Sequence, residues 1–233
     1  KVLSSGKEND YEELNVLFPS ISWSPDNKSI AMSLKSGGWD VIDIIDVETE
    51  DIYSLPVQLE GIESVAWSPD GKKIAFVGAN TTQTDIYVFY LDTKELVNVT
   101  SDIFTDNDPS WSPDSKKVFF VSDRGDNVSA DPEEKNIDIL DHNFYQMDLF
   151  YNDIDSKEVT RLTDWEYCAE RSAVASPDGK EILFVSDKNG ISNIYKKRIV
   201  LTDQDTVSSV VDLPAYPITN SIGELNQLSL SAD

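Results

Sequence analysis

Three aspartates within seven residues form the first candidate for chemistry in this chain. Asp102, Asp106 and Asp108 directly precede Ser110 to Ser112, which the sequence predicts to be an inner β-strand. Carboxylate oxygens are the ligands that Ca²⁺ prefers, so this group could hold a calcium ion. Their spacing does not match the twelve-residue calcium loop, and capping of turns by Asp side chains is the alternative. We expect no cofactor, with Ca²⁺ as the one candidate to test.

A second acidic group lies in an insertion at residues 126–142, with the sequence DNVSADPEEKNIDILDH. Long loops on a regular scaffold often carry binding functions. We therefore predict a partner-contacting or cation-binding loop here, and a disordered acidic loop is the alternative. The acidic residues of this loop are Asp126, Asp131, Glu133, Glu134, Asp138 and Asp141.

The residues needed for common catalytic devices are scarce. His142 is the one histidine and Cys168 the one cysteine, and no G-x-S-x-G elbow occurs. A Ser-His-Asp or Cys-His device needs a positioned histidine base, and a zinc site needs several His and Cys ligands. No glycine-rich phosphate loop is present either. The sequence predicts no catalytic and no cofactor-binding residues, and hence no enzyme.

One module, seen best between Val65 and Asp92 (VAWSPDGKKIAFVGANTTQTDIYVFYLD), is repeated along the chain. Its opening returns as ISWSPD at Ile21, PSWSPD at Pro109 and AVASPDG at Ala173, and more weakly as LSLSAD at Leu228. Trp23, Trp67 and Trp111 lie 44 residues apart, whereas Ala175 follows after 64 residues. Asn27 and Ser115 replace the glycine of the turn. Such a period is typical of tandem structural units.

Each module reads as four short strands separated by turns. Ser-Pro-Asp-Gly is turn chemistry, and runs such as Ile74 to Val77 are apolar throughout, as expected for strands covered on both faces. The fold class is therefore an all-β propeller of four-stranded antiparallel blades, with about four complete blades and parts of a fifth, in a single domain over 1–233. The expected blades are 18–59, 62–102, 107–164 and 170–213, with 1–5 and 226–233 as parts of a further blade. We expect the chain to be a segment of a larger propeller, with Pro214 to Pro217 in a linker to the next blade.

The repeated W-S-P-D-G-K-K-I-A-F followed by D-I-Y resembles the TolB-like, WD-repeat-like β-propeller family over nearly the whole chain. The resemblance implies a protein of the bacterial periplasm or cell surface, made as a secreted precursor. It also implies protein partners, such as an envelope lipoprotein associated with peptidoglycan or an attached outer-membrane module.

Charge excludes several partners. The 233 residues carry 43 Asp and Glu against 19 Lys and Arg, for a formal net charge of -24. Such a chain repels phosphate backbones and anionic headgroups, so we expect no nucleic acid and no direct membrane insertion.

Two functions fit these observations. The first is a non-catalytic propeller that serves as a protein-interaction platform in the bacterial envelope. The alternative is a propeller that gates or regulates an attached hydrolase of the prolyl-oligopeptidase type, whose catalytic domain lies outside this chain. A lyase with a metal in the channel is disfavoured, because the histidines it would need are missing.

Overall fold

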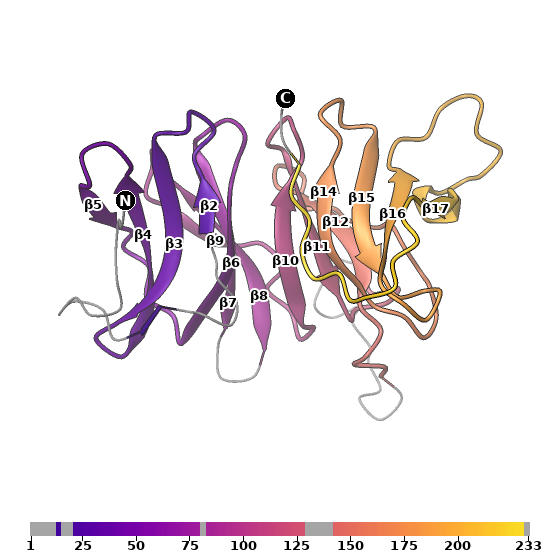
Figure 1. Ribbon diagram of the computed structural model, residues 1–233, viewed down its shortest axis with the longest axis horizontal. Coiled ribbons are helices and arrows are strands. Elements are labelled where there is room, and N and C mark those ends of the chain that lie inside the picture. Colours follow the sequence, from indigo (N-terminus) through magenta and orange to yellow (C-terminus); the bar gives the residue numbers. More distant parts are fainter. Residues whose placement is uncertain (1–12, 15–20, 80–82, 129–141, 231–233) are drawn as a thin grey trace. The chain divides into compact units, whose positions relative to one another are not determined.

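The chain is built from antiparallel sheets in which consecutive strands pair (Figure 1). The computed structural model describes residues 13–14, 21–79, 83–128 and 142–230. These residues form two compact units, Lys1–Ile103 and Phe104–Asp233, each with two sheets. The predicted all-β propeller of four-stranded blades is confirmed.

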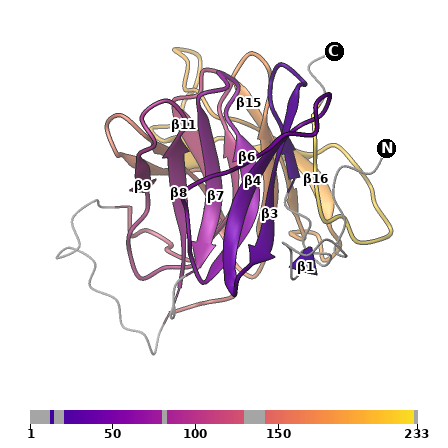
Figure 2. The same ribbon diagram turned by 90° about the vertical axis from the view of Figure 1, so that its left-hand side faces the viewer.

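The first unit contains a five-stranded and a four-stranded sheet (Figure 2). In the five-stranded sheet the path is β1-β3-β4-β5, and β2 pairs with β3. The other sheet follows the chain order β6-β7-β8-β9. The strands are β1 (Glu13–Leu14), β2 (Ile21–Trp23), β3 (Ser29–Ser36), β4 (Trp39–Asp46), β5 (Ile52–Ser54), β6 (Gly61–Trp67), β7 (Lys73–Ala79), β8 (Thr84–Tyr90) and β9 (Leu96–Asn98).

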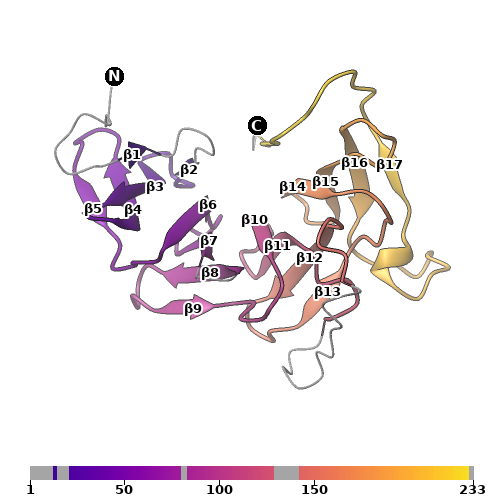
Figure 3. The same ribbon diagram turned by 90° about the horizontal axis from the view of Figure 1, so that it is seen from below.

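The second unit contains two four-stranded sheets that both follow the chain order, and Figure 3 shows β14 to β17 side by side. A single turn of 3₁₀ helix, η2 (Val210–Asp212), lies before the last strand. The strands are β10 (Asp106–Trp111), β11 (Lys117–Ser122), β12 (Asp148–Asp153), β13 (Val159–Arg161), β14 (Glu170–Ala175), β15 (Glu181–Ser186), β16 (Asn193–Arg198) and β17 (Ala215–Pro217).

The Ser-Pro-Asp turn has the same hydrogen bonds in all four sheets. The serine hydroxyl donates to the aspartate 2.6–2.7 Å away, at Ser24–Asp26, Ser68–Asp70, Ser112–Asp114 and Ser176–Asp178. The same hydroxyl accepts from the backbone N–H five residues on, at 2.9–3.0 Å. The residue after the aspartate is left-handed in each copy, with φ between 58° and 74° at Asn27, Gly71, Ser115 and Gly179. Asn27 and Ser115 therefore keep the turn that glycine makes elsewhere.

The repeated tryptophans occupy equivalent places. Each ends the first strand of its turn hairpin and pairs with the second residue of the next strand, as in Trp67↔Ile74 and Trp111↔Val118. Ala175↔Ile182 continues the pattern without the ring. Trp67 packs against the core of the first unit, in which Ile42 of β4 and Phe76 of β7 are fully buried.

The core of the second unit lies between its two sheets. One side is supplied by Phe119, Val121, Leu149 and Leu162, and the other by Ala173, Ile182, Phe184 and Tyr195. Trp165, from the loop between β13 and β14, packs its ring 5.1 Å from that of Tyr195 and 5.7 Å from that of Phe184. Burial of these side chains is the main driving force that holds the sheets face to face.

A segment interpreted as a linker contains a strand. Ala215–Pro217 forms β17, which pairs with β16 as the outermost strand of its sheet, although the sequence suggested a linker there. Glu13–Leu14, which precedes the first expected blade, also pairs with β3. Residues 226–230 have no strand, and the backbone N–H of Leu228 donates to Ser172 Oγ at 2.6 Å. The other parts of the expected further blade, 1–5 and 231–233, lie outside the described residues.

Candidate functional site

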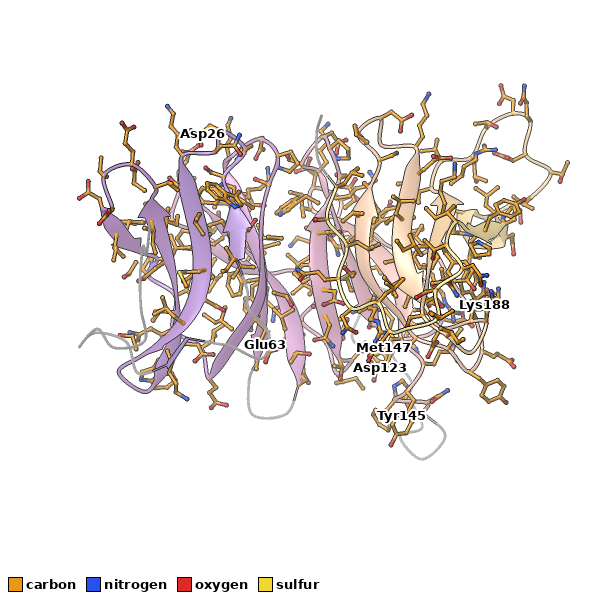
Figure 4. All side chains as sticks on the ribbon, in the orientation of Figure 1. Asp26, Glu63, Asp123, Tyr145, Met147 and Lys188 are labelled. Atoms are coloured by element: carbon orange, nitrogen blue, oxygen red, sulfur yellow. The ribbon has the colours of Figure 1, made fainter. Side chains whose placement is uncertain are left out.

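Three loops leave the sheets of the second unit at the same end. They connect β11 to β12 (residues 123–147), β13 to β14 (162–169) and β15 to β16 (187–192). The register places Ser122 opposite Asp148 and Ser186 opposite Asn193, at the end where these loops begin and finish. Figure 4 shows Asp123, Tyr145, Met147 and Lys188 at this end. We call the described residues of these loops, 123–128, 142–147, 162–169 and 187–192, the loop-end surface.

Hydrogen bonds join the three loops. Met147 and Ala169 form a parallel bridge, and the N–H of Glu170 donates to the carbonyl of Met147 at 2.8 Å. The N–H of Ala169 donates to Asp187 Oδ1 at 2.9 Å. The loop-end surface is therefore held together by the backbone as well as by its side chains.

A buried arginine supports this end of the sheet. Arg124 Nη2 lies 2.7 Å from Asp106 Oδ1, and its Nε donates to Ser122 Oγ at 3.0 Å. The guanidinium also lies 5.0–5.6 Å from three aromatic ring centres, those of Phe104, Phe120 and Phe150. Both charged side chains are almost fully buried, so each compensates the desolvation of the other.

Arg161 joins a buried and an exposed carboxylate. Its Nη2 lies 2.6 Å from Asp148 Oδ2, and its Nη1 pairs with Asp126. Burial raises the pKa of Asp148 despite the favourable charge of Arg161. Asp126 is the member of the predicted acidic loop that the structure describes, and its side chain is exposed. Asp131, Glu133, Glu134, Asp138 and Asp141 lie outside the described residues.

His142 makes contacts that hold the long loop in place. Its Nε2 lies 3.1 Å from Asp123 Oδ2, and Asp123 Oδ1 accepts from the N–H of Thr105 at 2.8 Å. The imidazole packs at 4.5 Å from the ring of Phe144. These contacts attach the returning arm of the long loop to the sheet.

Glu170 is a buried acid with neutral donors around it. The hydroxyls of Thr163 and Ser186 donate to its two oxygens at 3.0 Å each, and Cys168 Sγ lies 3.8 Å away. Burial, assisted by the negative charge of Asp148, raises the pKa of Glu170 to about 8. Burial and Glu170 in turn raise the pKa of Cys168 to about 12, which disfavours thiolate chemistry. A carboxyl with a raised pKa suits general-acid work, but Glu170 is only 1% exposed and both oxygens accept hydrogen bonds.

The repeat shows what differs at Glu170. Glu170 pairs with Ser186 as Asp106 pairs with Ser122, so the two acids hold equivalent places. Arg124 follows Ser122 by two residues, as Lys188 follows Ser186. Arg124 pairs with its acid, whereas the Lys188 ammonium lies over the ring of Trp165, 3.5 Å from its centroid.

The three aspartates proposed for calcium belong to different units. Asp102 lies at the end of the first unit, where its backbone carbonyl accepts from the Gln83 amide. Asp106 pairs with Arg124, as described above. Asp108 Oδ2 accepts from the N–H of Ser172 at 3.0 Å, and burial raises its pKa. A calcium site at these residues stays a prediction, which a calcium titration of the melting temperature would test.

Aromatic side chains are exposed on the loop-end surface. Tyr145 is 90% exposed, Tyr167 92% and Phe144 56%. Each tyrosine stands two residues before its member of the Met147–Ala169 bridge, so both belong to the loops that this bridge joins. Tyrosine is enriched where proteins bind one another. Sequence reasoning missed Tyr145 and Tyr167, because nothing in their spacing places them together.

Four-stranded antiparallel modules repeated in tandem define the chain as a β-propeller protein. The model of the TolB beta propeller domain family matches residues 7–129, more than half of the chain. The chain therefore belongs to the TolB β-propeller domain family, as the repeat indicated.

Solved structures agree on the fold. TolB from Acinetobacter baumannii is 25% identical with a TM-score of 0.62, over 77% of this chain and 40% of that one. The putative TolB from Agrobacterium tumefaciens is 20% identical with a TM-score of 0.53, over 85% and 79%. A chain from a study of two prolyl endopeptidases is 16% identical with a TM-score of 0.53, over 82% and 28%. The last two show the fold alone, and the present chain spans about two-fifths of the length of the Acinetobacter protein.

Two searches found nothing, one among curated proteins and one for membrane-spanning helices among the described residues. No curated protein sequence matches the chain significantly. In the part of the chain that the structure describes, no helix has the length and hydropathy needed to cross a bilayer.

Proposed function

We propose that the chain is a non-catalytic interaction module of the bacterial cell envelope and that a partner protein binds its loop-end surface. The observation that carries this proposal is the pair of exposed tyrosines, Tyr145 and Tyr167, on two loops that the Met147–Ala169 bridge joins. Large aromatic side chains on a fixed backbone supply binding area at low entropic cost.

Several further observations support this choice. The chain belongs to the TolB β-propeller domain family, and a protein called TolB is among its structural neighbours. Two acid–arginine pairs lie beneath the surface and suit a rigid support. Asp106–Arg124 is buried, and in Asp148–Arg161 the acid is buried and the arginine is partly exposed. The pKa of the Cys168 thiol is too high for a nucleophile at neutral pH. An envelope lipoprotein or an outer-membrane module of the same assembly is the kind of partner we propose.

Photo-crosslinking tests the proposal. A crosslinking amino acid at Tyr145 or Tyr167, in the full-length protein of the native bacterium, should yield one dominant adduct in the envelope fraction. The same amino acid at Tyr216, an exposed tyrosine of β17, is the matched control and should not yield that adduct. The double variant Tyr145→Ser/Tyr167→Ser should reduce co-purification of the identified protein by about tenfold or more.

Two results would contradict the proposal. One is an adduct that forms equally from Tyr216, because the partner would then not be specific for the loop-end surface. The other is that the purified chain hydrolyses peptides or esters and that Glu170→Gln abolishes this activity. That result would show a catalytic role for the buried acid.

A further inference from the structure

Most of the exposed charges on the loop-end surface are negative. Asp164, Glu166 and Asp187 are exposed there, whereas Asp126 is paired with Arg161. Lys188 is the exposed cation among the described residues of these loops, and its ammonium is stacked on Trp165. A partner that reaches the tyrosines therefore meets a negative potential, which attracts cations and repels anions.

Lys188 and Trp165 also show how this surface holds a cation. The ammonium lies 3.5 Å from the centroid of the indole ring, and that ring also packs against the rings of Phe184 and Tyr195. Cations bind the faces of aromatic rings because the ring quadrupole is negative there. Tyr145 and Tyr167 offer further rings on the same joined loops, and each residue is at least 90% exposed. Exposed aromatic faces on a surface that also carries carboxylates suit arginine or lysine side chains.

We infer that the segment bound by the loop-end surface is a cationic stretch of protein, whose arginines or lysines stack on Tyr145 and Tyr167 and face Asp164 and Glu166. This inference rests on the proposed function and specifies the chemistry of the partner. An anionic segment is excluded from the same surface by charge repulsion. A segment that binds through apolar side chains alone would show no dependence on its charge.

Three synthetic peptides of equal length test the inference with the purified chain. The first alternates Arg with Ser, Phe and Gly, the second has Gln in place of Arg, and the third has Glu. Fluorescence anisotropy should show that the Arg peptide binds about tenfold or more tightly than the Gln peptide, and that the Glu peptide binds least. Binding of the Arg peptide should weaken as salt is added.

Charge-reversal variants locate the binding. Asp164→Lys/Glu166→Lys should remove most of the preference for Arg over Gln. Asp155→Lys/Glu158→Lys changes the net charge equally in the exposed turn between β12 and β13, at the other end of these strands, and should leave the preference intact. The double variant Tyr145→Ser/Tyr167→Ser should bind the Arg peptide about tenfold more weakly. Because all these side chains are exposed, the melting temperature should stay close to that of the parent chain.

The outcomes separate this inference from the proposed function. Equal binding of the Arg and Gln peptides, binding of none of the three, or a preference lost only in the Asp155/Glu158 variant would each overturn the cationic partner. None of these results affects the crosslinking test, which depends on the native partner. Failure of the crosslinking test alone would instead remove the proposed function.

Discussion

The carboxylate of Asp108 accepts a hydrogen bond from the backbone N–H of Ser172 at 3.0 Å, and the two residues hold the same place in successive repeats. Each lies three residues before the end of the first strand of its sheet, with φ of 53° and 51°. The register of each hairpin shifts there, between Asn107 and Ser110 and between Arg171 and Val174. The bulge of one sheet therefore binds the bulge of the next.

This relationship predicts the response to substitution at Asp108. Asp108→Ala should lower the free energy of unfolding by about 2 kcal/mol, because the Ser172 N–H loses its acceptor and alanine is strained at this φ. Asp108→Asn keeps an acceptor oxygen and tolerates the left-handed region, so it should cost less than about 1 kcal/mol. Urea unfolding curves with equal m-values measure both. Equal losses for the two variants would contradict the assigned role of the hydrogen bond.

The buried pair of Arg124 and Asp106 predicts a larger effect. Arg124→Met should destabilise the chain by about 3–5 kcal/mol, because the Asp106 carboxylate then stays buried without the arginine charge. Lys188→Met removes a cation from the equivalent place of the next sheet and should cost about 1 kcal/mol or less, since it loses a stacking contact at an exposed site. Thermal and urea unfolding of the two variants give the comparison. Similar losses at both positions would show that the buried pair has no special weight.

Glu170 predicts a specific dependence of stability on pH. Its pKa is raised to about 8 in the fold, from an ordinary value of 4.5, chiefly by burial. The stability that protonated Glu170 contributes is therefore fully present below about pH 4.5 and is lost as the pH rises to about 8. Glu170→Gln mimics the neutral acid and does not titrate. Its free energy of unfolding, relative to that of the parent chain, should therefore rise by about 1.4 kcal/mol for each pH unit within this window. Unfolding measured from pH 5 to pH 8 tests this, and parallel profiles for the two proteins would contradict it.

The turn glycine Gly179 predicts a graded series. Its φ is 67°, and a Cβ there would meet nothing closer than Pro113 Cδ at 3.8 Å. Gly179→Ala should therefore cost about 1 kcal/mol from backbone strain alone. Gly179→Asn should cost less than half of that, because Asn27 already adopts this conformation in the first sheet. Melting temperatures measured side by side decide the order, and an asparagine variant less stable than the alanine variant would contradict it.

The features that could be predicted from the sequence are those set by local patterns. The Ser-Pro-Asp turn, the tryptophan that ends the first strand and the apolar runs all recur at fixed spacing, so the propeller modules and their family could be predicted. Asn27 and Ser115 were recognised as departures, and the structure shows that both adopt the φ of the glycines they replace. Local chemistry was sufficient in these cases, because each turn is closed by residues within six positions of one another.

Other features depend on contacts that the pattern does not encode. Ala215–Pro217 is short, contains a proline and follows a long insertion, so its pairing with β16 could not be distinguished from a linker. Asp106 has an arginine partner, whereas Glu170, in the equivalent place, has no cation bonded to it in the described contacts. This contrast depends on tertiary packing, because Arg124 points to its acid and Lys188 lies over Trp165 instead. Tyr145 and Tyr167 become neighbouring candidates only through the Met147–Ala169 bridge between two loops.

The closed Ser-Pro-Asp turn also has a kinetic consequence. Its hydrogen bonds connect residues that are close in the chain, so the loop entropy needed to form the turn is small and each hairpin can form within microseconds, before any sheet meets another. An isolated hairpin is marginally stable at best, so packing against further strands is what retains it. Insertions such as residues 126–142 fall between hairpins, and a chain assembled in this way can lengthen such a connection without delaying its earliest steps.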